Sequence, residues 1–203
     1  MHAICTDLEG VWVPEVWINV ANKTGIEELR LTTRDIKDYD ELMQYRLKIL
    51  DKHNLKLKDI QDVIATIKPF DGARELMEEL QTKTRFIVVS DTFTQFAEPL
   101  MKQLGWPTLM CHNLVIDEND KIVDYKLRQK DPKRQVVKAL NSLKYDVIAF
   151  GDSYNDVTML EEADKAFLYR APQNVIEDFP QYPVATNFNE MRELIYKFFA
   201  ELS

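Results

Sequence analysis

The stretch that decides the fold is residues 3–11, which read Ala-Ile-Cys-Thr-Asp-Leu-Glu-Gly-Val. Its first four residues form a short run without clean apolar and polar alternation, the pattern expected of a strand covered on both faces. Two carboxylates two positions apart, Asp7 and Glu9, follow, and Gly10 comes directly after them. Open parallel sheets place their ligand crevice at the carboxyl ends of their strands. The stretch therefore predicts a buried parallel strand that carries acidic groups into a functional site.

Outward from this stretch, short apolar runs alternate with segments of helical periodicity. The further strand candidates are Phe86 to Val89, Thr108 to Cys111, Val147 to Phe150 and Ala166 to Tyr169. The segments of helical periodicity between them are Ala73 to Thr82, Gln95 to Leu104, Pro132 to Leu143 and Asn155 to Ala163. Pro132 suits a first helical turn, where its missing N–H would have no partner. The alternation predicts an α/β protein with a doubly wound, Rossmann-like parallel sheet.

Two segments break this alternation. Residues 15–69 show only helical patterning, over the ranges 16–23, 42–53 and 57–67, and a strand crossover needs nothing so long. We therefore predict a small helical cap at residues 15–69, inserted after the first strand into a core made of residues 1–14 and 70–203. The second segment, Asn113 to Leu127, holds two apolar runs around the turn residues Asp117 to Asp120. It predicts a β-hairpin that extends the edge of the sheet.

Composition and charge exclude several classes of protein. The 203 residues carry 26 Lys and Arg against 34 Asp and Glu, a formal net charge of −8 at pH 7. Nucleic-acid backbones are bound by clustered positive charge, so an acidic chain without a Lys/Arg-rich run is not expected to bind nucleic acid. Apolar runs such as Val147 to Phe150 fall far short of the roughly 20 residues that span a bilayer, so we expect no membrane span.

The first residues and the cysteines indicate the cellular compartment of the protein. The acidic residue Asp7 occurs before an apolar stretch of signal-peptide length can accumulate, so we expect no export signal. Cys5 and Cys111 lie in apolar strand-like segments without paired ligand spacing, which favours buried thiols in a reducing compartment over a disulfide or a zinc site. We therefore expect a cytoplasmic protein. No role is assigned to the histidines, which show no metal-ligand spacing: His2, His53 and His112.

Further polar groups stand at the ends of two other predicted strands. Ser90 and Asp91 follow the second strand candidate, and Gly151-Asp152-Ser153-Tyr154-Asn155-Asp156 follows a later one. Lys133 stands between these two groups, at the start of a predicted helix. Taken singly, each feature has an ordinary explanation as a solvated turn acid, a helix-capping acid or a solvated lysine. Their order and spacing along one chain make them a candidate site.

This ordered set resembles the haloacid dehalogenase (HAD) superfamily of phosphohydrolases. Its members share an Asp-x-acid-Gly opening, a strand-terminal Ser, a Lys and a Gly-Asp-x-x-Asn-Asp motif, and the resemblance covers nearly the whole chain. A helical cap after the first motif, with Glu15 and Arg46, is similar to the phosphoserine phosphatases. The opening 7–11 and the run Lys130 to Arg134 are similar to the bacterial group that combines this activity with homoserine phosphotransfer.

The resemblance implies a phosphomonoesterase of amino-acid biosynthesis that works through an aspartyl-phosphate. Asp7 would be the nucleophile and Glu9 the general acid and base. Mg²⁺ would be held by Asp7, the main-chain carbonyl of Glu9 and Asp152, because hard oxygen ligands suit this cation. The metal ion and Lys133 would offset the repulsion between a carboxylate and an anionic phosphate. Asp156 would support the metal or Lys133.

The resemblance also implies a set of substrate-binding residues. Ser90 and Lys133 would bind phosphate oxygens, while Arg46 and Glu15 would match the carboxylate and the ammonium of phosphoserine. Asn155 would contact the phosphate or the substrate. Asp91 would add negative charge beside the phosphate site, and it is assigned to contact with the ammonium of the substrate.

Several alternatives stay open. Lys130 is a second candidate for the role of Lys133, and another small phosphorylated metabolite is a second candidate for the substrate. The phosphoryl group could pass to water or to an alcohol such as homoserine, since both reactions share one intermediate. Glu9 stands where most relatives carry Asp, which moves the acid/base carboxyl by one methylene. A receiver-like signalling domain also carries a phosphoacceptor Asp, but it has no cap of this length.

Overall fold

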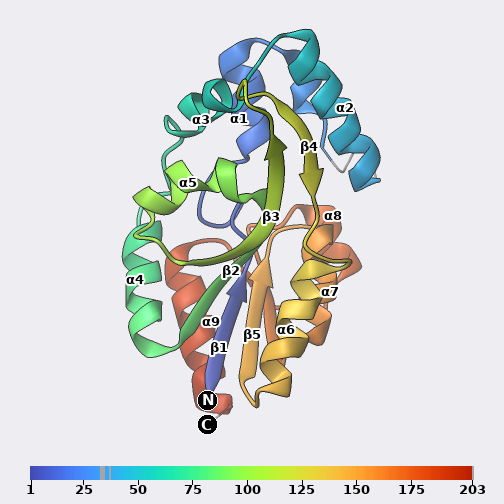
Figure 1. Ribbon diagram of the computed structural model, residues 1–203. Helices are drawn as coiled ribbons and strands as arrows, with labels where there is room; N and C mark the ends of the chain where they lie inside the picture. The colour runs from blue at the N-terminus through green and yellow to red at the C-terminus, as the bar shows by residue number, and fades with distance from the viewer. Residues whose placement is uncertain (33–34, 37, 203) are drawn as a thin grey trace.

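The computed structural model describes residues 1–32, 35–36 and 38–202, which form a central sheet with helices on both faces (Figure 1). The strands are β1 (His2–Thr6), β2 (Arg85–Phe93), β3 (Thr108–Ile116), β4 (Ile122–Lys126), β5 (Asp146–Gly151), β6 (Lys165–Tyr169) and β7 (Val184–Ala185). They form one seven-stranded sheet in the order β4-β3-β2-β1-β5-β6-β7. Neighbouring strands are parallel except β3 and β4, which are antiparallel. The predicted α/β, doubly wound class is confirmed.

Helices α1 to α8 lie in the connections between strands, and α9 follows the last strand. In chain order they are α1 (Val16–Thr24), α2 (Tyr39–Lys52), α3 (Leu57–Ile64), α4 (Ala73–Lys83), α5 (Thr94–Gln103), α6 (Pro132–Ser142), α7 (Val157–Glu162), α8 (Gln173–Asp178) and α9 (Phe188–Glu201), with 3₁₀ turns at η1 (Glu27–Arg30) and η2 (Tyr154–Asp156). The segment after β6, which holds α8, β7 and α9, was not predicted from the sequence.

Both faces of the sheet are buried, which explains why its strands lack polar alternation. Ile4 of β1 packs in one apolar cluster with Leu76 of α4 and Ile195 of α9. The next residue, Cys5, packs in a second cluster on the opposite face with Val137 of α6. Burying a side chain of this kind contributes roughly 1.5–3 kcal/mol, so each strand is stabilised from both sides. The free carboxyl end of β1 is then available for polar groups.

Helices α1, α2 and α3 lie between β1 and β2 in the sequence and gather beyond the carboxyl end of the sheet (Figure 1). β3 runs from the sheet towards them, pairing first with β2 and then with β4. The predicted third strand and the first arm of the predicted hairpin are therefore one strand, and β4 forms the sheet edge as predicted. Asp120 in the hairpin turn accepts hydrogen bonds from the N–H groups of Leu57 and Lys58 at the start of α3. We propose that residues 15–69 act as a cap held by this hairpin.

Local capping shifts some of the predicted boundaries. α2 begins at Tyr39 instead of Leu42 because the side chain of Asp38 accepts a hydrogen bond from the N–H of Glu41. The helix predicted from Asn155 begins as the 3₁₀ turn η2 and continues as α7. A hydrophobic pattern alone contains neither signal, since both arise from polar side chains at the helix start.

Candidate active site

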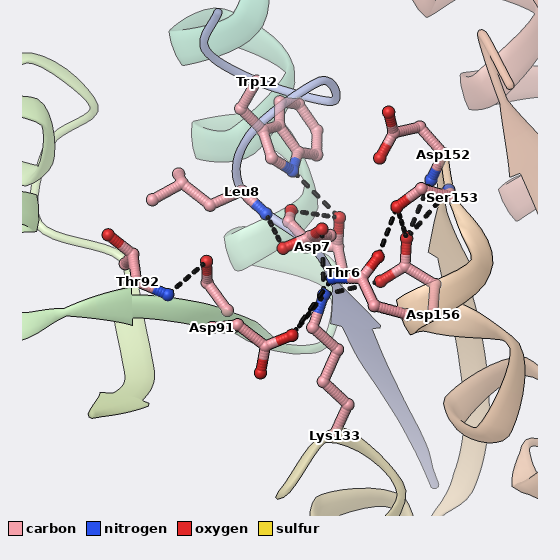
Figure 2. Close-up of polar contacts among 12 residues, drawn as sticks. Thr6, Asp7, Leu8, Trp12, Asp91, Thr92, Lys133, Asp152, Ser153 and Asp156 are labelled. Atoms are coloured by element: carbon pink, nitrogen blue, oxygen red, sulfur yellow. Dashed lines mark hydrogen bonds and ion pairs between the residues drawn. The ribbon is translucent and has the colours of Figure 1, made fainter. Parts of the chain in front are cut away.

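Asp7 follows β1 directly and is held in place by its neighbours (Figure 2). Its N–H continues the pairing with β5 by donating to the carbonyl of Phe150. Its carboxylate Oδ1 accepts from the N–H of Leu8 at 2.7 Å. Behind it, the indole of Trp12 donates to the hydroxyl of Thr6, which in turn donates to the main-chain carbonyl of Asp7. The Asp7 carboxylate is buried and has a fixed orientation before any substrate arrives.

Lys133 joins the acidic groups that come from different strands. Its Nζ lies 2.7 Å from Asp156 Oδ1, 2.9 Å from Asp7 Oδ2 and 3.8 Å from Asp91 Oδ2 (Figure 2). Burial alone would lower the pKa of Lys133, but the three carboxylates outweigh it and raise the pKa well above its usual value. The lysine therefore remains charged. Lys130, the second candidate, is exposed.

Two glycines let the acidic strand ends approach one another. Asp156 is fully buried, and its Oδ2 accepts from the N–H groups of Asp152 and Ser153. A Cβ on Gly151 would lie 2.2 Å from the Asp156 carboxyl carbon, and a Cβ on Gly10 would lie 2.4 Å from Asp152 Oδ2. Gly10 also has a φ of 76°, which side-chain-bearing residues rarely adopt. Glycine is therefore required at both positions for the carboxylates to converge.

The converging carboxylates form a group suited to a cation. Oxygen atoms of Asp7, Asp152 and Asp156 all lie within 4.8 Å of one another, and the three residues are buried. Burial, together with repulsion from Asp156 and Asp152, raises the pKa of Asp7 well above its usual value, although Lys133 opposes this rise. Oxygen-only donors and excess negative charge fit a hard divalent cation such as Mg²⁺.

Glu9 turns towards the helices beyond the sheet. Its Oε2 accepts from the N–H of Val16, the first residue of α1, at 2.8 Å. Burial and the nearby charge of Glu15 raise the pKa of Glu9 to about 7, although the Val16 N–H and Arg46 oppose the rise. Glu15 precedes α1 and is exposed. The Glu9 carboxyl thus caps α1 and lies among the charges predicted to bind substrate.

Arg46 of α2 is buried beside this group. Its guanidinium lies 4.5 Å from the ring centroid of Trp17, and its Nη2 donates to the carbonyl of Leu31 at 2.9 Å. Burial lowers the pKa of Arg46 to about 10, and the neighbouring Tyr39, Glu9 and Glu15 limit the fall. The side chain therefore stays cationic at neutral pH and is positioned by an aromatic face and a carbonyl.

The remaining predicted residues line the side of the site next to β2. Ser90 is buried, and its Oγ accepts from the N–H of Thr92 at 3.3 Å. Asn155 donates through Nδ2 to Asp91 Oδ2 at 3.0 Å, so its amide contacts a neighbouring predicted residue. Burial would raise the pKa of Asp91, but Lys133 and hydrogen bonds from His112 and Asn155 lower it to about 2. Asp91 is therefore ionised.

Two side chains at the site were missed in the sequence. His112 on β3 is buried and lies 3.5 Å from Asp91 Oδ1 through its Nε2. The hydroxyl of Tyr39, at the start of α2, donates to the main-chain carbonyl of Asp91 at 2.9 Å. Neither residue belongs to a motif, and only the pairing of β3 with β2 places His112 opposite Phe93, close to Asp91.

The fold and the acidic site define a class of enzyme. Residues 3–164 match the haloacid dehalogenase-like hydrolase family, and the chain belongs to that family. The resemblance to this superfamily inferred from the sequence is thereby confirmed. Among the residues described by the structure, no helix is both long and apolar enough to cross a membrane.

Two phosphoserine phosphatases of Pseudomonas and one solved structure are similar to this chain over most of its length. A phosphoserine phosphatase of Pseudomonas syringae pv. tomato is 58% identical over 193 residues, covering 95% of this chain and 81% of that protein. Phosphoserine phosphatase ThrH of Pseudomonas aeruginosa is 56% identical over 197 residues, covering 97% of this chain and 96% of that protein. A crystal structure of phosphoserine phosphatase in its apo form shares the fold, with a TM-score of 0.76 at 19% identity over 96% of this chain and 98% of that one.

Proposed function

We propose that this chain is a phosphoserine phosphatase that converts L-phosphoserine into serine and phosphate. The observation that carries the chemistry is the buried ion pair of Asp7 with Lys133 at the carboxyl end of β1. Such a pair supplies a nucleophile together with the positive charge needed to approach an anionic phosphate. The choice of phosphoserine rests on the relatives that share 56–58% of the sequence.

In the proposed first step, a carboxylate oxygen of Asp7 attacks phosphorus and the bond from phosphorus to the serine oxygen breaks. An aspartyl-phosphate forms on Asp7, and the serine oxygen takes up a proton. Lys133 and the hydroxyl of Ser90 bind phosphate oxygens. Lys133 is already within 2.9 Å of Asp7 and buried, so little reorganisation is needed as charge develops.

A divalent cation, proposed to be Mg²⁺, would be held by Asp7, Asp152 and the main-chain carbonyl of Glu9. When bound, it would neutralise part of the negative charge of the phosphoryl group. Asp156 belongs to the same acidic group, but its two oxygens already accept from Lys133 and from two main-chain N–H groups. We assign Asp156 the task of orienting Lys133 and the turn that carries Asp152.

Glu9 is the proposed acid and base. It donates the proton taken up by the serine oxygen and then removes a proton from the water that attacks the aspartyl-phosphate. A pKa of about 7 suits both roles, because the group exchanges a proton readily near neutral pH. The hydrogen bond from the Val16 N–H gives the carboxyl a fixed position at the boundary between β1 and α1.

Arg46 and Glu15 are the proposed selectors of the amino-acid part of the substrate. Arg46 would pair with the carboxylate and Glu15 with the ammonium, and Asn155 and Asp91 would complete the wall beside the phosphate. The buried guanidinium is held by Trp17 and Leu31, so it offers a positioned charge and not a mobile one.

We further propose that the same intermediate can transfer its phosphoryl group to homoserine. The observation that favours this is the position of the Glu9 carboxyl, which is hydrogen-bonded to the start of α1 beside the charges of Glu15 and Arg46. An amino alcohol bound by those charges would bring its hydroxyl to the same base that activates water. Product analysis with and without homoserine tests this, since transfer would yield phosphohomoserine at the expense of free phosphate.

The direct test of the function is a panel of phosphomonoesters assayed with Mg²⁺. L-Phosphoserine should give the highest kcat/KM, and thorough chelation should abolish turnover until Mg²⁺ is restored. Asp7→Asn protein serves as the control for contaminating phosphatases. A higher kcat/KM for an unrelated phosphomonoester would contradict the proposed substrate, and full activity after chelation would contradict the metal.

A further inference from the structure

His112 is a buried histidine whose contacts connect it to the site through one residue. Its ring is enclosed by aromatic neighbours, with Tyr39 and Phe93 at centroid distances of 6.4 Å and 6.3 Å. Its exposed fraction is 2%, so its ring is shielded from solvent. The polar neighbour on the active-site side is Asp91, whose Oδ1 lies 3.5 Å from Nε2. His112 is therefore placed to act on the site through Asp91.

The main chain fixes which ring nitrogen faces Asp91 with a proton. The N–H of Arg128 donates to Nδ1 of His112 at 3.1 Å. A nitrogen that accepts a hydrogen bond carries a lone pair, so the hydrogen of the imidazole is on Nε2. Nε2 is also the ring nitrogen that lies 3.5 Å from Asp91 Oδ1. The imidazole therefore faces Asp91 with a hydrogen-bond donor and not with an acceptor.

The other oxygen of Asp91 faces the residues that would handle phosphate. Oδ2 accepts from Asn155 Nδ2 at 3.0 Å and lies 3.8 Å from Lys133 Nζ. By comparison, the same ammonium is 2.9 Å from Asp7 and 2.7 Å from Asp156. Asp91 is thus close to Lys133 but held outside direct hydrogen-bond distance. Its main-chain carbonyl is also held, by the hydroxyl of Tyr39.

We propose that His112 is a positioning residue that holds the Asp91 carboxylate back from Lys133, so that the lysine stays available to a phosphate oxygen. Asp91 is an ionised neighbour of the lysine, and a carboxylate freed on one side could rotate and close to a full ion pair. It would then compete with the phosphoryl group for the same ammonium. This proposal rests on the role given to Lys133 in the proposed function.

Two substitutions separate this role from a merely structural one. In His112→Gln, the side-chain amide can place a donor near the position of Nε2, so contact with Asp91 is kept. In His112→Asn, the shorter amide can accept from the Arg128 N–H near the position of Nδ1, but it does not reach Asp91. If His112 served only to hold Arg128, His112→Asn would be the milder change; our proposal predicts the opposite.

The readout is the inhibition constant of inorganic phosphate, measured with p-nitrophenyl phosphate as substrate. His112→Asn should raise this constant and the KM by about 10-fold, the lower end of the loss when an outer hydrogen-bond partner is removed, with a smaller change in kcat. His112→Gln should stay within about 3-fold of the unmodified protein. His53→Asn, at an exposed histidine, is the matched control and should change neither constant.

Asp91→Asn shows whether His112 acts through Asp91. Once residue 91 is uncharged, adding His112→Asn should change the phosphate constant by less than about 2-fold, because no charge is left to compete for Lys133. Additive effects of the two substitutions would overturn the proposal. Nitrogen NMR of the labelled protein should also show His112 protonated on Nε2, and protonation on Nδ1 alone would overturn it.

These outcomes distinguish the two proposals. If the protein binds phosphate but prefers another monoester over phosphoserine, only the proposed substrate fails. Equal effects of His112→Asn and His112→Gln overturn only the role of His112. A protein that binds no phosphate, with Mg²⁺ present, overturns both.

Discussion

Two groups of charged residues meet at this site, and they are built differently. At the carboxyl ends of the strands, Lys133 is buried with Asp7 and Asp156 at hydrogen-bond distance. Towards α1 and α2, Glu9 bonds to a main-chain N–H, Arg46 rests on Trp17 and a carbonyl, and Glu15 is exposed. The first group is assembled from side chains that hold each other, whereas Glu9 and Arg46 in the second group are each held by the fold around them.

The difference has a chemical consequence. A buried network of mutually paired charges needs little reorganisation during a reaction. Removing one member is strongly unfavourable, since the other buried charges are left unpaired. Charges held separately can be changed one at a time. We therefore expect substitutions in the strand-end group to affect every phosphomonoester, and substitutions in the group around Arg46 to affect selectivity.

The largest expected effect is that of Asp7→Asn. The amide has nearly the same shape but is a poor nucleophile, so turnover of every phosphomonoester should fall by at least ~10³-fold. Measurement of kcat on L-phosphoserine and on p-nitrophenyl phosphate checks this, with circular dichroism as the control for folding. Retained turnover of pure protein would place the nucleophile elsewhere.

Arg46→Ala should separate the two groups. The expected loss in kcat/KM for L-phosphoserine is about 2–4 kcal/mol, the scale for removal of a buried charged contact. A phosphomonoester without a carboxylate should lose far less, because it does not use the guanidinium. Equal losses on both substrates would mean that Arg46 supports the cap or the phosphate instead.

Glu9→Gln should act on the second half of the reaction. The amide cannot deprotonate water, so hydrolysis of the aspartyl-phosphate should slow by about 10²-fold, and more than its formation from a substrate with a good leaving group. Rapid quenching should then show accumulated phosphoenzyme. Glu9→Asp should change the ratio of free phosphate to phosphohomoserine when homoserine is present, and an unchanged ratio would remove Glu9 from acceptor choice.

The smallest effect is expected at Lys130. This side chain is exposed, so Lys130→Ala should leave kcat/KM within about 2-fold, whereas Lys133→Ala should remove most activity. The pair of variants compares two lysines three positions apart in the same segment. A large loss for Lys130→Ala would show that the exposed lysine takes part in binding.

Much of the strand-end group could be predicted from the sequence. Asp7, Asp152 and Asp156 follow apolar runs, and parallel strands bring such ends to one edge, where the structure places their oxygens within 4.8 Å of one another. The functional roles stay predictions. Sequence left Lys130 and Lys133 as alternatives, because only the packing of α6 shows which of the two is buried.

What the sequence did not supply depends on contacts between distant segments. His112 lies near Asp91 through strand register, and the start of α2 reaches the same residue through Tyr39. β7 has two residues, too few for a periodic signal.

The last helix could have been predicted, since Asn187 caps it and Met191 and Ile195 have the spacing of a buried helix face.

The measurement that tests the central claim most directly is the location of the phosphoryl group on the enzyme. Glu9→Gln protein would be mixed with Mg²⁺ and labelled p-nitrophenyl phosphate, whose good leaving group needs no proton from residue 9, then quenched rapidly in acid, digested and mapped by mass spectrometry. We expect the label on the peptide that contains Asp7, as an acid-stable and base-labile acyl phosphate, and none on Asp7→Asn, Glu9→Gln protein. Label on another residue, or steady release of phosphate with no labelled protein, would contradict the assignment of Asp7 as nucleophile.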